Sequence, residues 1–167
     1  MKSMRKPNRT GVKHEQRMDR VPGDSYRDEA KPRGPLACPK CGASYDKGRW
    51  SWAKAAPNAL RRKCPACRRI DDKIPAGIVT LTVSGSFATA HAGEIVELIR
   101  GREARERDEH PMQRIIAIEP SESGMVVTTT DPHLARTIAT ALHSAFGGKM
   151  EVAHDGDEEP VRAGWSR

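Results

Sequence analysis

Beyond Pro75, apolar and polar residues alternate with the periods of a small domain of strands and helices. Apolar residues occupy every second position from Val79 to Phe87, which predicts a half-buried strand with Phe87 on its core side. A helical stripe of apolar residues follows within Ala90–His110, and Pro111 ends that helix. Two short strands, a second helix and a last strand are predicted over Arg114–Glu119, Met125–Thr130, Pro132–Phe146 and Lys149–Ala153.

The ends of the two predicted helices carry recognisable signals. Asp131 is expected to cap the second helix with Pro132 at its first position, and Gly147 ends it. The second half of the first helix, residues 100–109, is nearly all charged and is expected to be solvated. Ion pairs four residues apart are predicted there between Arg102 and Glu106, Glu103 and Arg107, and Arg105 and Glu109.

The resulting order, β-α-β-β-α-β, is the split arrangement of ferredoxin-like domains, so the predicted fold class is α+β. That fold hosts RNA-binding modules, metal carriers and sensors alike, and the order alone indicates no function. An RNA recognition motif stacks bases on aromatic residues of its central strands, and only Phe87 is available here. We therefore expect a structural or protein-contacting role for this domain.

The two ends of the chain lack such periodicity. Residues 1–35 are rich in proline and glycine and poor in large apolar groups, which predicts a disordered basic arm. Residues 154–167 contain a cluster of acidic residues and are predicted to be a disordered acidic tail. The predicted division is an arm over 1–35, a ribbon over 36–75, the ferredoxin-like domain over 76–153 and a tail over 154–167.

Charge separates these segments further. The 167 residues carry a formal net charge of +7, with 37% hydrophobic and 31% charged residues. Residues 36–75 alone hold 10 basic and 3 acidic residues, a net +7, whereas residues 76–153 hold 7 and 10, a net −3. A basic N-terminal half favours a polyanionic partner such as nucleic acid. No apolar run is long enough for a membrane span or a signal peptide, so we expect a cytoplasmic protein.

All four cysteines fall in two C-x2-C pairs, at Cys38 and Cys41 and at Cys64 and Cys67, separated by 22 residues. Each pair can direct two thiolates at one point, and two such turns complete a tetrahedral set for zinc. The gap is slightly longer than the usual spacing and suits a ribbon with a longer hairpin or a short helix between its pairs. Gly42 suits the positive φ that finishes such a turn. We predict one structural Zn²⁺.

Three other uses of the cysteines compete with structural zinc. Disulfides are disfavoured because the sequence has no secretion signal, and a thioredoxin-like pair needs a single C-x-x-C beside a βαβ unit. A rubredoxin-type iron site uses nearly the same ligands, so iron stays the second prediction for the metal. Electron carriers of that type are usually acidic and rich in aromatic residues, unlike residues 36–75.

The segment between the cysteine pairs combines tryptophans with basic residues. In an extended segment Trp50 and Trp52 share one face, where they could stack on bases, although covering the metal site is the expected role for at least one of them. The basic cluster could equally be a solvated surface, and its density favours phosphate contacts. The predicted nucleic-acid-binding residues are Lys47, Arg49, Trp50, Trp52, Arg61, Arg62, Lys63, Arg68 and Arg69.

Signals for catalysis are missing from the sequence. It contains no G-x-S-x-G, no phosphate-binding loop and no dinucleotide fingerprint, and its histidines share no ligand spacing. We therefore expect a protein that is not an enzyme, with no small-molecule substrate evident.

The cysteine frames, the Gly-Arg-Trp-Ser-Trp run between them and the following Cys-Pro-Ala-Cys-Arg-Arg-Ile and Pro-Ala-Gly resemble a group of small uncharacterised bacterial zinc-ribbon proteins. Their ribbon resembles one in the ribosomal large-subunit export adaptor, the nonsense-mediated decay protein 3 family. The resemblance covers residues 36–77, with Thr-Thr-Thr-Asp-Pro-His-Leu-Ala-Arg as a further likeness to the bacterial group. It implies zinc at Cys38, Cys41, Cys64 and Cys67 and binding to ribosome-linked RNA.

Two functions follow as hypotheses from different classes. The first is a zinc-ribbon RNA-binding protein associated with the ribosome, whose arm and ribbon neutralise phosphates while the C-terminal domain positions it or contacts a protein. The second is a protein-interaction adaptor whose ribbon is purely structural. A rubredoxin-like redox protein is third.

Overall fold

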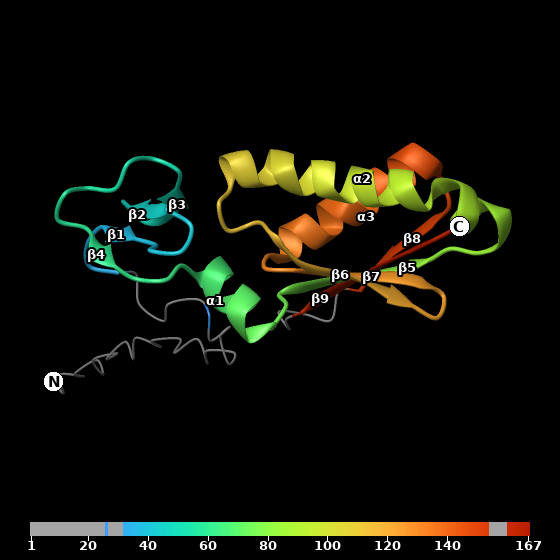
Figure 1. The fold of residues 1–167 in the computed structure, drawn as a ribbon, viewed down its shortest axis with the longest axis horizontal. Helices are drawn as coiled ribbons and strands as arrows, with labels where there is room; N and C mark the ends of the chain where they lie inside the picture. The colour runs from blue at the N-terminus through green and yellow to red at the C-terminus, as the bar shows by residue number, and fades with distance from the viewer. Residues whose placement is uncertain (1–25, 27–31, 154–159) are drawn as a thin grey trace, which may run out of the picture.

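The computed structural model describes Tyr26, residues 32–153 and residues 160–167. Most of the predicted basic arm, and the acidic part of the predicted tail, therefore lie outside the described residues. The described chain forms a small cysteine-containing β region followed by a larger α+β unit, which confirms the predicted fold class (Figure 1).

The cysteine-containing region is a four-stranded sheet followed by a short helix, and we call residues 36–75 the ribbon. Its sheet has the order β3-β2-β1-β4. A tight turn with positive φ at Lys47 and Gly48 joins β2 to β3, as expected for a two-residue hairpin. The elements are β1 (Leu36–Ala37), β2 (Ser44–Asp46), β3 (Arg49–Ser51), β4 (Leu60–Arg61) and α1 (Pro65–Asp72).

The α+β unit has the predicted order for its first six elements. The largest boundary difference is near Phe87, since the strand predicted to reach it ends at Thr82 and the helix begins at Gly85. Phe87 therefore packs against the core from a helix, edge-on to Phe146 at 5.9 Å between ring centroids. The elements are β5 (Gly77–Thr82), α2 (Gly85–Glu109), β6 (Ile115–Ser121), β7 (Gly124–Thr129), α3 (Pro132–Phe146), β8 (Lys149–Val152) and β9 (Val161–Ser166).

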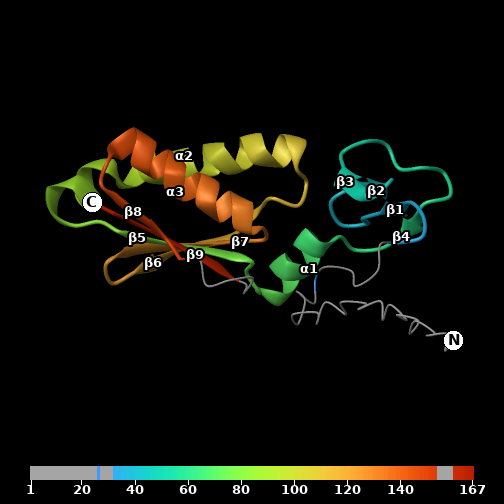
Figure 2. The same cartoon turned by 180° about the vertical axis from the view of Figure 1, so that it is seen from behind.

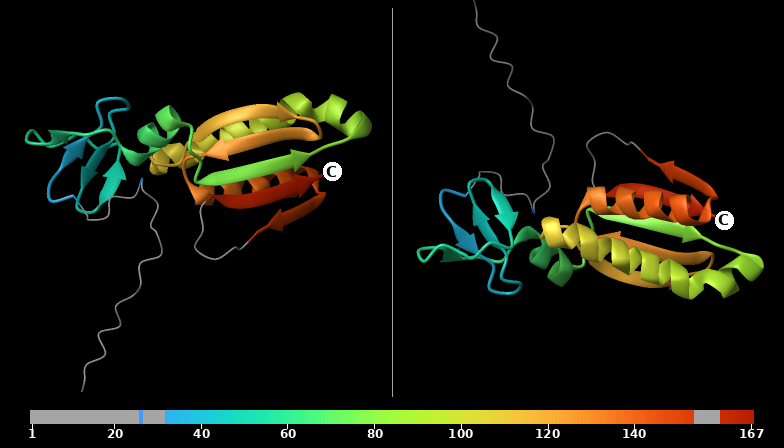
Figure 3. Two further views of the ribbon diagram at one scale, coloured as in Figure 1. Left: turned by 90° about the horizontal axis from the view of Figure 1, so that it is seen from below. Right: turned by 90° about the horizontal axis from the view of Figure 1, so that it is seen from above.

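The seventh element, β9, corrects the prediction of a disordered tail for its residues. The sheet order is β6-β7-β5-β9-β8. In a ferredoxin-like sheet β8 would pair directly with β5, whereas here β9 lies between these two strands (Figure 3). It pairs parallel to β5 and antiparallel to β8. Val161, Ala163 and Trp165 alternate along it, and Trp165 is only 1% exposed while its Nε1 donates to the carbonyl of Gly147 at 2.8 Å. Burial of this aromatic residue explains why the segment is ordered.

Helices α2 and α3 cover one face of the five-stranded sheet, and the core lies between the two layers (Figures 1 and 2). The predicted cap at the start of α3 is confirmed, because Asp131 Oδ1 accepts from the backbone N–H of His133 at 2.7 Å. A Cβ at Gly77 would lie 2.6 Å from Cβ of Ala135, so this glycine lets α3 approach β5 closely. No helix in the described ranges is long and apolar enough to cross a membrane.

The ion pairs predicted on the second half of α2 do not form. Among the described residues, the one ion pair within α2 joins His91 and Glu94, near its start. Glu103 instead accepts from the backbone N–H of Ile115 at 2.8 Å, and Arg107 lies over the ring of Trp52. Contacts with the rest of the protein replace the pairs expected of an isolated helix.

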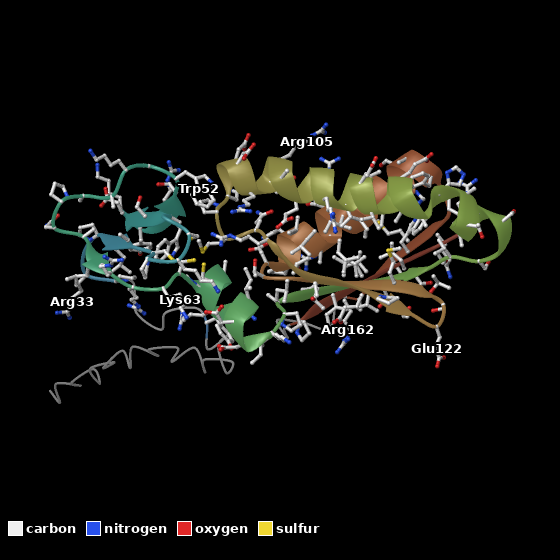
Figure 4. The ribbon with its side chains drawn as sticks, viewed as in Figure 1. Arg33, Trp52, Lys63, Arg105, Glu122 and Arg162 are labelled. Atoms are coloured by element: carbon white, nitrogen blue, oxygen red, sulfur yellow. The ribbon has the colours of Figure 1, made fainter. Side chains whose placement is uncertain are left out.

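Replacing Trp165 by alanine tests whether β9 belongs to the core. We expect W165A to lower the free energy of unfolding by about 3–5 kcal/mol, because it leaves a cavity and an unpaired carbonyl at Gly147. Urea unfolding measures this change. R162A is the matched control, since Arg162 is exposed on the same strand, and its effect should stay within about 0.5 kcal/mol (Figure 4). Equal stability of W165A and the wild type would contradict the role assigned to β9.

Candidate metal centre

The four cysteines meet at one point of the ribbon, as their spacing predicts. Their Sγ atoms all lie within 4.8 Å of one another, and those of Cys41 and Cys64 are 3.7 Å apart. Four sulfurs around a tetrahedral zinc, at about 2.3 Å from the ion, would lie about 3.8 Å from one another. None of the four forms a disulfide. The set therefore fits a single thiolate-bound metal ion.

The first pair sits on a tight turn between β1 and β2. The backbone N–H of Gly42 donates to the carbonyl of Cys38 at 3.0 Å, and that of Cys38 donates to the carbonyl of Ala43 at 2.8 Å. Gly42 has a φ of 81°, which confirms the predicted positive angle. This turn directs the sulfurs of Cys38 and Cys41 to the same side.

The second pair lies at the start of α1 rather than on a second strand turn. Cys64 is the N-cap of the helix, Pro65 follows at its first position, and the backbone N–H of Cys67 donates to Cys64 Sγ at 3.4 Å. The backbone N–H of Cys64 in turn donates to Cys38 Sγ at 3.3 Å. A helix N-terminus favours negative charge, so this placement offsets part of the cost of burying the thiolates.

Apolar side chains cover the cysteine cluster. Ala66 is buried with it, and Trp50 and Met112 pack against it. Trp50 also lies directly across the hairpin from Tyr45, with ring centroids 5.6 Å apart. Trp50 thus covers the metal site, as expected for one of the two tryptophans.

A buried arginine from the α+β unit reaches the cysteine cluster. Arg114 is 5% exposed, and its Nη1 donates to Cys67 Sγ at 3.3 Å. Its Nε donates to the carbonyl of Pro111 at 2.8 Å, and its backbone N–H donates to Thr130 Oγ1 at 2.9 Å. The loop between α2 and β6 therefore holds this guanidinium against the thiolates.

Trp52 makes a second contact between the ribbon and the α+β unit. It lies beyond the end of β3 and is 38% exposed. Its Nε1 donates to the backbone carbonyl of Arg107 at 2.6 Å, and the guanidinium groups of Arg107 and Arg114 lie 5.7 and 5.6 Å from its ring centroid. Figure 4 shows Trp52 beside the C-terminal end of α2. Cation–π contact of this kind fixes the ribbon at that end of the helix.

Thiolate electrostatics at this site favour a bound cation. Burial raises the pKa of the Cys64 and Cys67 thiols, because their anions lose water. Burial also acts to raise the pKa of Cys38. Hydrogen bonds from backbone N–H groups, the strongest from Cys64, outweigh it and lower the pKa of Cys38 to about 6. Burial would lower the pKa of Arg114, yet the surrounding thiolates outweigh it and raise that pKa, so the guanidinium stays charged. A divalent ion would compensate the remaining negative charge.

The nine residues predicted to contact nucleic acid are distributed between surface and interior. Five basic residues of the set are exposed, and Lys63 pairs with Asp71 at 2.6 Å. Lys40 shares that carboxylate. Because each partner of Asp71 keeps a large exposed fraction, these pairs add little stability. The exposed basic residues of the predicted set are Lys47, Arg49, Arg61, Arg62 and Lys63.

Arg68 and Arg69 face the chain instead of open solvent. Arg69 is 3% exposed, its Nη1 donates to the carbonyl of Ile74 at 3.2 Å, and its guanidinium lies 4.6 Å from the ring centroid of Tyr26. Arg68 Nη2 donates to the backbone carbonyl of Tyr26 at 2.7 Å. In this arrangement Arg69 cannot contact a polyanion.

Sequence reasoning missed Arg114, Met112 and Tyr26 as neighbours of the ribbon. Arg114 and Cys67 are 47 positions apart and belong to different structural units. No local periodicity reports a contact between two units, so no sequence signal indicated these partners.

Comparison of the chain with protein-family models, with curated proteins and with solved structures finds no match. The four-cysteine cluster in a small β-rich region is thus established by geometry alone. The likeness of its ribbon to that of the export adaptor remains a hypothesis.

Replacing Arg114 by glutamine tests its role beside the metal centre. We expect R114Q to weaken zinc binding about 10–100-fold, the usual cost of removing an outer hydrogen-bond partner of a metal ligand. Competition with a chromophoric chelator measures the affinity. R107Q is the matched control, because Arg107 contacts Trp52 from the other unit without touching a sulfur, and it should bind zinc as the wild type does. Wild-type affinity in R114Q would refute the assignment.

Proposed function

We propose that this protein is a non-enzymatic, cytoplasmic zinc-ribbon protein that binds RNA, with the ribosome as its candidate partner. The proposed zinc site is supported by four cysteine sulfurs that lie within 4.8 Å of one another. Four thiolates in a tetrahedral set suit zinc, and zinc supplies folding free energy that the ribbon lacks in apolar core. The ribbon's own buried apolar residues are few and small apart from Leu36 and Tyr45.

Metal analysis of the purified protein tests the identity of the ion. We expect one zinc per chain in a colourless preparation, and loss of the metal in C67S, because three thiolates no longer close the site. Inductively coupled plasma mass spectrometry and visible absorbance provide the measurement. A coloured protein containing iron would favour the rubredoxin-like alternative, and a chain without metal would contradict both.

RNA binding is supported by the charge that the ribbon presents to solvent. Lys47 and Arg49 lie on and after the β2–β3 turn, and Arg61 and Arg62 lie at β4. All four side chains are exposed. Binding to the phosphates of RNA needs several exposed cations along one surface rather than isolated charges.

Substituting three exposed arginines of the ribbon tests this proposal. We expect R49Q/R61Q/R62Q to weaken binding of single-stranded RNA. The slope of log affinity against log salt concentration should become shallower by about two, since each phosphate contact contributes about 0.7 to it. Fluorescence anisotropy over a salt series measures both.

The matched control for this experiment removes the same charge from the α+β unit. R100Q/R105Q/R162Q substitutes three exposed arginines outside the ribbon. It should keep the wild-type slope, because these three arginines of the α+β unit are not proposed to contact RNA. Equal losses in both triple variants would show that net charge alone attracts RNA.

A protein-interaction adaptor is the second candidate, because the ribbon exposes apolar side chains. Leu60 is 70% exposed and Ile74 is 47% exposed. A protein partner that covers these side chains would remove apolar surface from water, which favours association. If this candidate is correct, L60S reduces capture of a partner while R49Q/R61Q/R62Q leaves it unchanged.

A further inference from the structure

A groove between the two helices of the α+β unit has the features of an anion-binding site. Helices α2 and α3 lie side by side over the sheet (Figure 3). The groove between them holds a cavity of about 490 Å³, within the size range of small-molecule sites. Leu98 and Arg102 line it from α2, and Arg136, Thr137, Ala141 and Ser144 line it from α3.

Two arginines line this cavity without a counter-charge. Its lining residues include no carboxylate. Within the described part of the chain, the side chains of Arg102 and Arg136 form no ion pair, and Glu106, the partner predicted for Arg102, does not meet it. The Nε atom of Arg136 is buried and has no hydrogen-bond partner. A buried donor without a partner is costly, as are two like charges around one cavity.

The remaining lining completes a site for a ligand with a charged end and a less polar end. The hydroxyl groups of Thr137 and Ser144, which lie seven residues apart on one face of α3, can donate hydrogen bonds. Leu98 and Ala141 supply an apolar surface beside them. Guanidinium groups bind phosphate through paired N–H donors, and two of them match a dianionic phosphate better than a single carboxylate.

We propose that this groove binds a small organic phosphate, with Arg102 and Arg136 on the phosphate and the apolar surface against the rest of the molecule. The site is independent of the proposed zinc and RNA functions, because neither the cysteines nor the exposed basic residues of the ribbon line it. It places a ligand site on the α+β unit, whose predicted role was structural or protein-contacting.

Calorimetric titration of the zinc-loaded protein with adenosine 5′-monophosphate tests the proposal, with adenosine as the probe that lacks the phosphate. We expect binding of the nucleotide but not of the nucleoside, and competition by inorganic phosphate but not by acetate at the same ionic strength. R102Q and R136Q should each reduce affinity about tenfold or more, as expected from the loss of a charge-assisted hydrogen bond.

R105Q is the matched control for these variants. Arg105 lies on the same helix as Arg102, is exposed and points away from the sheet (Figure 4). R105Q should bind the nucleotide as the wild type does. R102Q and R136Q should also unfold at a higher temperature than the wild type without ligand, because each removes one of two like charges. A purely structural role for these arginines would lower that temperature.

The proposal is overturned if the wild type binds neither the nucleotide nor inorganic phosphate, or if R105Q weakens binding as much as R136Q. Binding of acetate as strong as that of phosphate would overturn the assignment of ligand class. Binding of a single-stranded oligonucleotide that depends on Arg136, without binding of the nucleotide, would replace the small ligand by nucleic acid.

Discussion

The structure depends on the contact between the Arg114 guanidinium and the thiolate of Cys67. Four thiolates around a divalent ion leave a net charge of −2, and placing such a charge away from water costs free energy unless a cation accompanies it. Arg114 supplies that cation from the second structural unit, at 3.3 Å from Cys67 Sγ. Its fixed position depends on Pro111 and Thr130. The metal centre is therefore built by both units together.

This shared construction explains why the loop after α2 is so strongly held. Thr130 Oγ1 donates to the carbonyl of Met112 at 2.6 Å, and the backbone N–H of Thr130 donates to the carbonyl of Arg114 at 2.8 Å. The same loop places Met112 against the cysteines. Next to Arg114, Trp52 contacts the end of α2. Without a bound metal the buried cysteines take up protons, which removes the negative charge that Arg114 compensates and so would weaken the attachment of the ribbon.

The sequence predicted features that neighbouring residues determine, and it missed contacts between residues that are far apart in the chain. The cysteine pairs, the turn at Gly42 and the cap at Asp131 are local, and each was predicted because a few neighbouring residues determine it. Strand β9 was missed, although Val161, Ala163 and Trp165 alternate, because an acidic cluster precedes this short segment and dominated its interpretation. Arg114 was missed because its charge resembles any surface arginine until the fold brings it to the cysteines.

The distribution of charge changes in the same way once the fold is known. The ribbon's formal charge of +7 counts Arg69, which is buried under Tyr26, and Lys40 and Lys63, which share Asp71. Such cations stabilise the ribbon or are partly compensated, so the charge available to a polyanion is smaller than the sequence indicates. In the α+β unit the opposite holds, because the net charge of −3 over residues 76–153 conceals two arginines around one cavity. Local placement of cations, rather than the net charge of a segment, therefore determines where each unit can bind an anion.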